Sequence, residues 1–227
     1  MKLGVLNCGP APELVAPIHG EYLVWFDALL SPHGFDLVMW NVEQMEFPED
    51  VYDADAWLIT GSKHGAYEAH EFIPPLEAFI RDIHAAQVPL VGICFGHQIV
   101  ATALEGRVEK VEAGWEFGRR AYQTAALGEV FLNACHQDQV VELPPGAEVI
   151  ALNETCPIAG MEIGPACVTL QPHPEIDPVI LADYVPHFRQ ANNDMTEAMI
   201  AQAERDLSLP TNETEVGAWL AEVLRGN

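Results

Sequence analysis

The sequence is poor in positive charge. Only 10 of its 227 residues are Lys or Arg, whereas 34 are Asp or Glu, and the formal net charge is −24. Proteins bind nucleic acids and anionic membrane surfaces through patches of Lys and Arg. The composition therefore argues against both partners and indicates an acidic, solvated surface.

Long hydrophobic runs, paired cysteines and repeats are lacking as well. No stretch approaches the roughly eighteen uninterrupted apolar residues of a membrane span. The apolar stretch within residues 1–10 is too short for a signal peptide, so we expect these residues to form a first buried strand. The five cysteines show no CxxC spacing, which argues against a disulfide framework or a cysteine zinc site and agrees with a reducing cytoplasm.

Apolar residues make up 49% of the chain, enough for a sizeable core in one domain or a domain with a small appendage. Its first half alternates short apolar runs with helical patterns. Strands are predicted at 2–6, 35–40, 56–60 and 88–93, and helices at 20–30, 72–87 and from 99 to a glycine cap at Gly106. This alternation is typical of βαβ units around a parallel sheet, whose ligand sites lie at the carboxyl ends of the strands.

The second half has a different character. Short strands are predicted at 107–111, 118–124, 129–132, 147–152, 158–163 and 167–171, in a mixed, partly antiparallel section. Helical patterns follow at 176–190, 195–207 and 213–224. We expect an α/β domain over 1–190 and a C-terminal helical extension over 191–227 that packs on it.

The strand at 88–93 leads directly into Cys94 and then into a helical pattern. Gly92 and Gly96 flank the cysteine at two residues on each side, as around the nucleophile of a strand-turn-helix elbow. The start of a helix lowers the pKa of a thiol and offers backbone N–H groups to an oxyanion. A buried structural cysteine is the alternative, but the glycines and the switch from strand to helix favour a nucleophile.

A cysteine nucleophile needs a base and a group that orients the base. His173 follows the apolar run 166–170, so it is expected at a strand end level with Cys94. Glu175 lies two residues further on and can accept the second imidazole N–H. The alternative is an ordinary surface turn. The histidines His64, His70, His97 and His136 have no familiar zinc-ligand spacing, so neither a metal nor a cofactor is expected.

Three ordered motifs resemble those of the class I glutamine amidotransferase family, across residues 2–190: Gly92-Ile-Cys-Phe-Gly-His-Gln98, His136-Gln-Asp-Gln-Val140 and His173-Pro-Glu175. The resemblance implies a flavodoxin-like three-layer α/β sandwich with a mostly parallel sheet. It also implies that Cys94 is a nucleophile toward a γ-carboxamide, that His173 is the base and then the acid, and that Glu175 orients His173.

The resemblance extends to residues around this triad. The loop after residue 60 is similar to the family's oxyanion loop, so backbone N–H groups at Gly61 or Ser62, with that of Phe95, are expected to hold the tetrahedral oxyanion. Gln98 matches a substrate-contacting glutamine. Residues Cys135 and His136 match the segment that holds the substrate's α-amino and α-carboxylate groups; an ordinary packed histidine is the alternative for His136.

Some positions depart from the family pattern. Pro172 stands where many members have an aromatic residue, and Cys135 where serine is frequent. The stretches 61–67 and 114–118 look closer to a standalone branch that includes plant γ-glutamyl peptidases. In that branch Lys63 can attract an extra carboxylate of a γ-glutamyl peptide; the alternative is a solvated loop lysine.

Three functions remain open at this point. The first is a standalone hydrolase acting on glutamine, a γ-glutamyl peptide or a γ-glutamyl conjugate. The second is a glutaminase subunit that passes ammonia to a separate synthetase partner. The third is a binding protein without catalysis, which the intact triad makes the weakest of the three.

Overall fold

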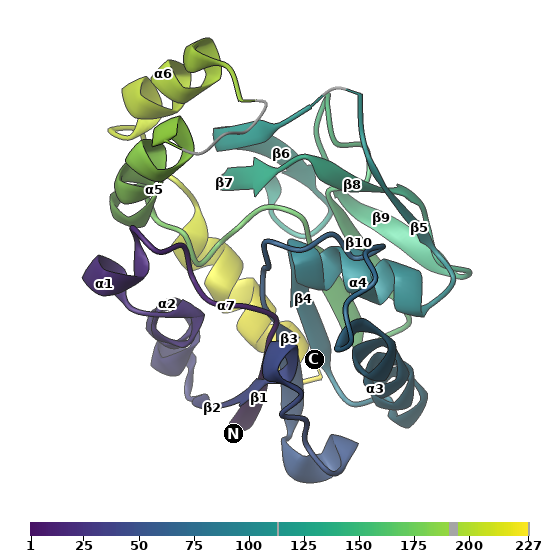
Figure 1. The fold of residues 1–227 in the computed structure, drawn as a ribbon. Helices are drawn as coiled ribbons and strands as arrows, with labels where there is room; N and C mark the ends of the chain where they lie inside the picture. The colour runs from purple at the N-terminus through teal and green to yellow at the C-terminus, as the bar shows by residue number, and fades with distance from the viewer. Residues whose placement is uncertain (113, 191–194, 227) are drawn as a thin grey trace.

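The computed structural model describes residues 1–112, 114–190 and 195–226 (Figure 1). Their framework is one large twisted sheet in the order β2-β1-β3-β4-β11-β10-β9-β6-β7, accompanied by a two-stranded sheet β5-β8. The strands are β1 (Lys2–Asn7), β2 (Asp36–Asn41), β3 (Ala56–Ile59), β4 (Leu90–Ile93), β5 (Arg107–Lys110), β6 (Glu116–Thr124), β7 (Gly128–His136), β8 (Asp138–Glu142), β9 (Ala147–Leu152), β10 (Gly160–Ile163) and β11 (Cys167–Leu170).

The half of the sheet that positions the site is parallel. Strands β2, β1, β3, β4 and β11 run side by side in the same direction, and β3, β4 and β11 are buried along their whole length. Their registers pair Ile59 with Gly92 and Ile93 with Leu170. The loops that follow β3, β4 and β11 therefore leave the sheet at one edge, as expected from the alternating pattern.

The antiparallel section continues the same sheet through β10, β9, β6 and β7. Two features differ from the sequence prediction. Strand β7 continues beyond the predicted 129–132 to His136, and β8, which is not predicted, follows after one residue. Residues 133–139 are mostly polar and have no clear alternation, so no strand was predicted there. Their extended shape is imposed by pairing of β7 with β6 and of β8 with β5.

Helices cover both faces of the sheet and make a three-layer α/β architecture (Figure 1). One core joins α2 (Tyr22–Leu30) and α7 (Glu213–Leu224) to the face that carries Leu58; the other joins α3 (Ile73–Ala86) and α4 (Phe95–Ala103) to the face that carries Trp57 and Ile59. The remaining helical segments are α1 (Ala16–His19), α5 (Pro178–Gln190), α6 (Glu197–Asp206) and the short turns η1 (Ser31–His33), η2 (Val42–Gln44) and η3 (Val51–Asp53). The predicted fold class is thus confirmed.

The C-terminal helices pack on the sheet and on neighbouring helices. Helix α7 lies against α2 and β4, and α6 lies against β6. At the α6 contact Gly118 has a φ of 83°, and a Cβ there would lie 2.7 Å from the Cβ of Ala203. The expected division between 1–190 and 191–227 falls at residues 191–194, outside the described residues, and stays a prediction. In the described parts of the chain, no helix has the length and apolar character needed to cross a membrane.

The end of α4 differs from the expected glycine cap. Glu105 adopts the left-handed conformation, with a φ of 74°, and Gly106 donates its N–H to the Ala101 carbonyl at 2.7 Å. Gly106 is required for a different reason: a Cβ there would lie 2.8 Å from the Glu142 carbonyl oxygen. The glycine thus allows the chain to pass close to the end of β8.

The contact between α4 and β3 generates a stability prediction. Replacing a helical glycine with Ala normally favours the helix, by up to about 1 kcal/mol. In Gly96→Ala, however, the new Cβ would lie 2.4 Å from the backbone oxygen of Ile59. We expect a net loss of about 1–3 kcal/mol from overpacking, measured as a lower urea midpoint.

Gly217→Ala in α7 is the matched control. Its Cβ would meet Cδ1 of Leu29 at 2.6 Å, an atom at the end of a flexible side chain that can move aside. The loss should be clearly smaller than in Gly96→Ala. Equal stability of the two variants would contradict the rigid contact between α4 and β3.

Candidate active site

Cys94 occupies a strained turn between β4 and α4. Its φ is 54° and its ψ is −104°, a conformation that costs a non-glycine residue about 1–3 kcal/mol. The Cys94 N–H donates to the Leu170 carbonyl at 2.8 Å, which ties the turn to β11. The flanking glycines allow close approach: a Cβ on Gly92 would lie 2.5 Å from the Gly96 oxygen. The strain in this turn thus falls on the cysteine itself.

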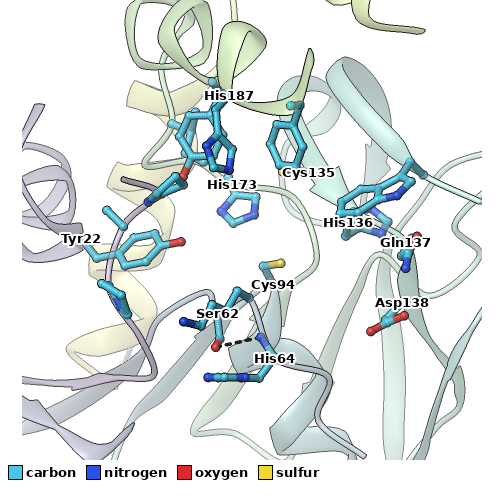
Figure 2. Close-up of a pocket in the computed structure, with 18 of the residues that line it drawn as sticks. Tyr22, Ser62, His64, Cys94, Cys135, His136, Gln137, Asp138, His173 and His187 are labelled. Carbon is cyan, nitrogen blue, oxygen red and sulfur yellow. Dashed lines mark hydrogen bonds between the residues drawn. The ribbon is translucent and has the colours of Figure 1, made fainter. Parts of the chain in front are cut away.

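His173 lies beyond the end of β11, as the sequence predicted, and is held from two sides. Its backbone N–H donates to the Asn133 carbonyl at 2.9 Å, which joins it to β7. Its Nδ1 lies 2.6 Å from Oε1 of Glu175, so Nδ1–H donates to the carboxylate. Cys94 is near enough to the imidazole to be one of the groups that raise its pKa. Figure 2 shows the sulfur of Cys94 beside this ring. His173 therefore lies between Cys94 on one side and the carboxylate of Glu175 on the other.

The charges around His173 determine its protonation. Burial alone would lower the pKa of the imidazole, because it disfavours the charged form. The Glu175 carboxylate and Cys94 outweigh burial and raise the pKa of His173 well above its usual value. The ring is thus suited to hold a proton next to the sulfur.

The loop after β3 reaches the same place. A Cβ on Gly61 would lie 3.2 Å from Cε1 of His173, so this backbone passes directly beside the imidazole. The Ser62 hydroxyl donates to the Cys8 carbonyl at 2.7 Å and accepts the His64 N–H at 3.2 Å (Figure 2). Phe95 is the first residue of α4, so its N–H has no acceptor within the helix. The predicted oxyanion-hole residues are therefore grouped around Cys94.

A cavity of about 460 Å³ opens in front of Cys94 and His173. The four residues predicted to bind substrate, Lys63, Gln98, Cys135 and His136, all line it. Gln98 is fixed by its Nε2, which donates to the Asp138 carbonyl at 3.0 Å and to Oε1 of Gln171 at 3.2 Å. Lys63 is exposed at the cavity.

Two of these residues are strongly affected by burial. Burial lowers the pKa of His136 to about 4. The Glu116 carboxylate, whose Oε2 lies 4.0 Å from Nε2 of His136, acts in the opposite direction and raises this pKa. Burial also raises the pKa of Cys135 well above its usual value. His136 is therefore a neutral imidazole at neutral pH, and Cys135 is a neutral thiol.

An aromatic wall of the cavity was missed from the sequence. It consists of Tyr22 from α2, Trp115 before β6, and Tyr184 and Phe188 from α5. The Tyr184 and Phe188 rings stack at 6.0 Å, and Trp115 meets Phe188 edge-on at 5.6 Å. Tyr22 lies in the predicted helix at 20–30, and periodicity alone does not distinguish a core face from a cavity wall.

The Tyr22 hydroxyl is a further neutral group near the triad. A Cβ on Gly61 would lie 3.6 Å from its oxygen. Burial, together with the charges of Glu175 and Cys94, raises the pKa of Tyr22. The hydroxyl therefore stays protonated and can act as a hydrogen-bond donor.

Comparison with known proteins shows which family the chain is similar to. A sequence model of the family "Glutamine amidotransferase class-I" matches residues 32–181. Gamma-glutamyl peptidase 3 of Arabidopsis thaliana is 29% identical over 189 residues, which cover 76% of each chain. A GMP synthase of Aromatoleum aromaticum is 33% identical over 120 residues, 46% of this chain and 22% of the synthase.

The fold is shared with solved structures. A glutamine amidotransferase of Methylobacillus flagellatus superimposes with a TM-score of 0.75 at 20% identity, covering 98% of this chain and 92% of that one. Likeness at this identity concerns the fold alone. Together with the family match over most of the sequence, it shows that the chain belongs to the class I glutamine amidotransferase family.

Proposed function

We propose that the protein is a standalone cysteine hydrolase that cleaves the γ-amide bond of glutamine or of a γ-glutamyl peptide or conjugate. The observation that carries the proposal is that Cys94 and His173 both line the cavity, with His173 hydrogen-bonded to Glu175. The similarity to a plant protein named as a γ-glutamyl peptidase supports the substrate class. A cytoplasmic location is expected because the cysteines show no disulfide pattern.

Acylation begins with the sulfur of Cys94, whose proton His173 holds. The thiolate attacks the γ-carbonyl carbon, a C–S bond forms, and the carbonyl electrons move to the oxygen. Backbone N–H groups of Ser62 or Gly61 and of Phe95 stabilise this oxyanion; removal of one such donor typically costs about 3–4 kcal/mol of barrier. The C–N bond then breaks, His173 gives its proton to the leaving amine, and a glutamyl thioester remains.

Deacylation reverses the proton path. Water enters where the amine left, His173 takes one of its protons, and the water oxygen attacks the thioester carbonyl. The C–S bond breaks, glutamate leaves, and Cys94 returns to the thiolate, with the proton on His173. Glu175 keeps Nδ1 protonated through both steps, so Nε2 is the nitrogen that exchanges protons with sulfur, amine and water.

The alternative is a glutaminase subunit that delivers ammonia to a synthetase partner in trans. The match to part of a GMP synthase favours this alternative, because such a protein couples glutamine hydrolysis to synthesis. The two functions differ in what the isolated chain does. A standalone hydrolase turns over alone, whereas a subunit stays nearly silent until its partner is added. A binding protein would bind γ-glutamyl ligands without releasing any product.

The test is release of glutamate and of ammonia or amine by the purified chain, from glutamine and from a panel of γ-glutamyl amides. We expect the wild type to turn over at least one γ-glutamyl peptide, and its acyl-enzyme to be detected by mass spectrometry in rapidly quenched samples. Cys94→Ala should lower kcat by about a thousandfold or more. Cys167→Ala, which removes a buried thiol within β11, is the matched control and should keep its activity. Silence of the wild type on the whole panel would overturn the proposal.

The charges at His173 give a second prediction. Its imidazolium should persist above pH 6.5, the usual midpoint of histidine, in NMR spectra of protein labelled with ¹⁵N-histidine. Glu175→Gln should lower the His173 pKa most and Cys94→Ala less, because Glu175 raises it more strongly. Since the folded-state pKa is raised, His173 contributes stability that is fully present below pH 6.5 and is lost as the pH rises from 6.5 through the folded-state pKa.

The control for this titration is Glu204→Gln, which removes an exposed carboxylate that pairs with Arg189. It should leave the His173 titration unchanged. A midpoint of the wild type at or below 6.5, or an equal shift in all three variants, would contradict the proposed charge arrangement.

Lys63 generates a prediction about specificity. If its ammonium attracts the terminal carboxylate of a γ-glutamyl dipeptide, Lys63→Met should raise KM for that dipeptide by about 2–5-fold, the scale of an exposed ion pair. The matched substrate is the same dipeptide with a C-terminal amide, whose KM should not change. An equal change in KM for both substrates would show that Lys63 does not bind the terminal carboxylate.

A further inference from the structure

A cluster of metal-ligand side chains lies on the loop that follows β3, outside the triad. His64, Glu68 and His70 place one ligand atom each within 4.8 Å of one another. This cluster cannot be predicted from the sequence, because histidines six residues apart match no familiar zinc spacing. The bends of the loop between β3 and α3 bring the two rings together, with their centroids 4.0 Å apart.

The ligand atoms converge on Glu68. Its Oε2 lies 2.7 Å from Nε2 of His70 and 4.0 Å from Nδ1 of His64. The side chains of Glu68 and His70 are 48% and 36% exposed, and that of His64 is 16% exposed. The cluster therefore faces solvent on one side, where an ion can enter and keep a water ligand.

Glu43 holds the ring of His64 from the other side. Its Oε1 lies 2.9 Å from Nε2 of His64, so Nε2–H donates to the carboxylate and Nδ1 carries the lone pair. That lone pair is on the nitrogen nearest Glu68. Metal-binding histidines commonly donate their second ring N–H to a carboxylate in this way, which fixes the tautomer and raises the basicity of the ligand.

We propose that Nδ1 of His64, the carboxylate of Glu68 and Nε2 of His70 bind a divalent transition-metal ion of the Zn²⁺ class, with water in the fourth position. Two imidazoles and one carboxylate are a typical ligand set for Zn²⁺ with one open position. Mg²⁺ and Ca²⁺ are disfavoured, because both prefer sites built of oxygen ligands. The net charge of −24 raises the concentration of cations near the surface.

The position of the site connects it to the cavity. His64 lines the cavity, and its backbone N–H donates to the hydroxyl of Ser62. A bound ion would thus cross-link His64, Glu68 and His70 in the loop beside the backbone that is proposed to hold the oxyanion. This link to catalysis rests on the proposed function, whereas the binding of the ion does not, so binding is tested separately.

The experiment is calorimetric titration of Zn²⁺ into the Cys94→Ala protein, which removes the active-site thiol as a competing ligand. Millimolar Mg²⁺ in the buffer occupies carboxylates on the acidic surface. We expect one ion per chain. Adding His70→Gln or Glu68→Gln should abolish this binding, and adding Glu43→Gln should weaken it by about 10–100-fold, the usual effect of removing a carboxylate that orients a ligand.

The matched control adds His84→Gln in α3, a partly buried histidine outside the cluster, and should bind as tightly as Cys94→Ala. Circular dichroism of each variant verifies that it is folded. Co²⁺ should give visible d–d bands without a thiolate charge-transfer band. Absence of binding, affinity unchanged by His70→Gln and Glu68→Gln, or a thiolate band would each overturn the site.

Discussion

The strained backbone of Cys94 is the constraint on which the rest of the site depends. A non-glycine residue with a φ of 54° persists only where its surroundings hold it. Here β4 delivers the cysteine, β11 accepts its N–H, and α4 packs so closely on β3 that only glycine fits at residue 96. The stability of the parallel sheet therefore supports the conformation that presents the sulfur to the cavity.

Electrostatics then distinguish three buried histidines. Burial lowers the pKa of His97 to about 3 and of His136 to about 4. His97 has only uncharged partners, the Thr169 hydroxyl and the Ile158 carbonyl, and the carboxylate nearest His136 is 4.0 Å away. His173 has a carboxylate at 2.6 Å, and its pKa is raised. The short contact with Glu175, together with Cys94, thus distinguishes His173 from the two neutral rings.

Other parts of the chain complete the wall of the cavity around Cys94 and His173. Helix α5 supplies Tyr184, His187 and Phe188, and the segment before β6 supplies Trp115. In the proposed function these residues can contact the group attached to the γ-carbonyl. In the proposed function, the residues that follow β4 and β11 carry out the hydrolysis. The residues of α5 and of the segment before β6 determine which leaving amines are accepted.

Local features can be predicted from the amino-acid sequence: the elbow at Cys94, the pair His173 and Glu175, and the alternation of strands and helices, because each depends on neighbouring residues or on a short period. Features that join distant segments require the folded chain. The register of Ile93 with Leu170 brings Cys94 and His173 to one edge of the sheet. Pairing of β7 with β6 and of β8 with β5 holds the polar segment around His136 extended. The aromatic wall forms where α2 meets α5. The cluster of His64, Glu68 and His70 likewise requires the bends of its loop, and no sequence period encodes these bends.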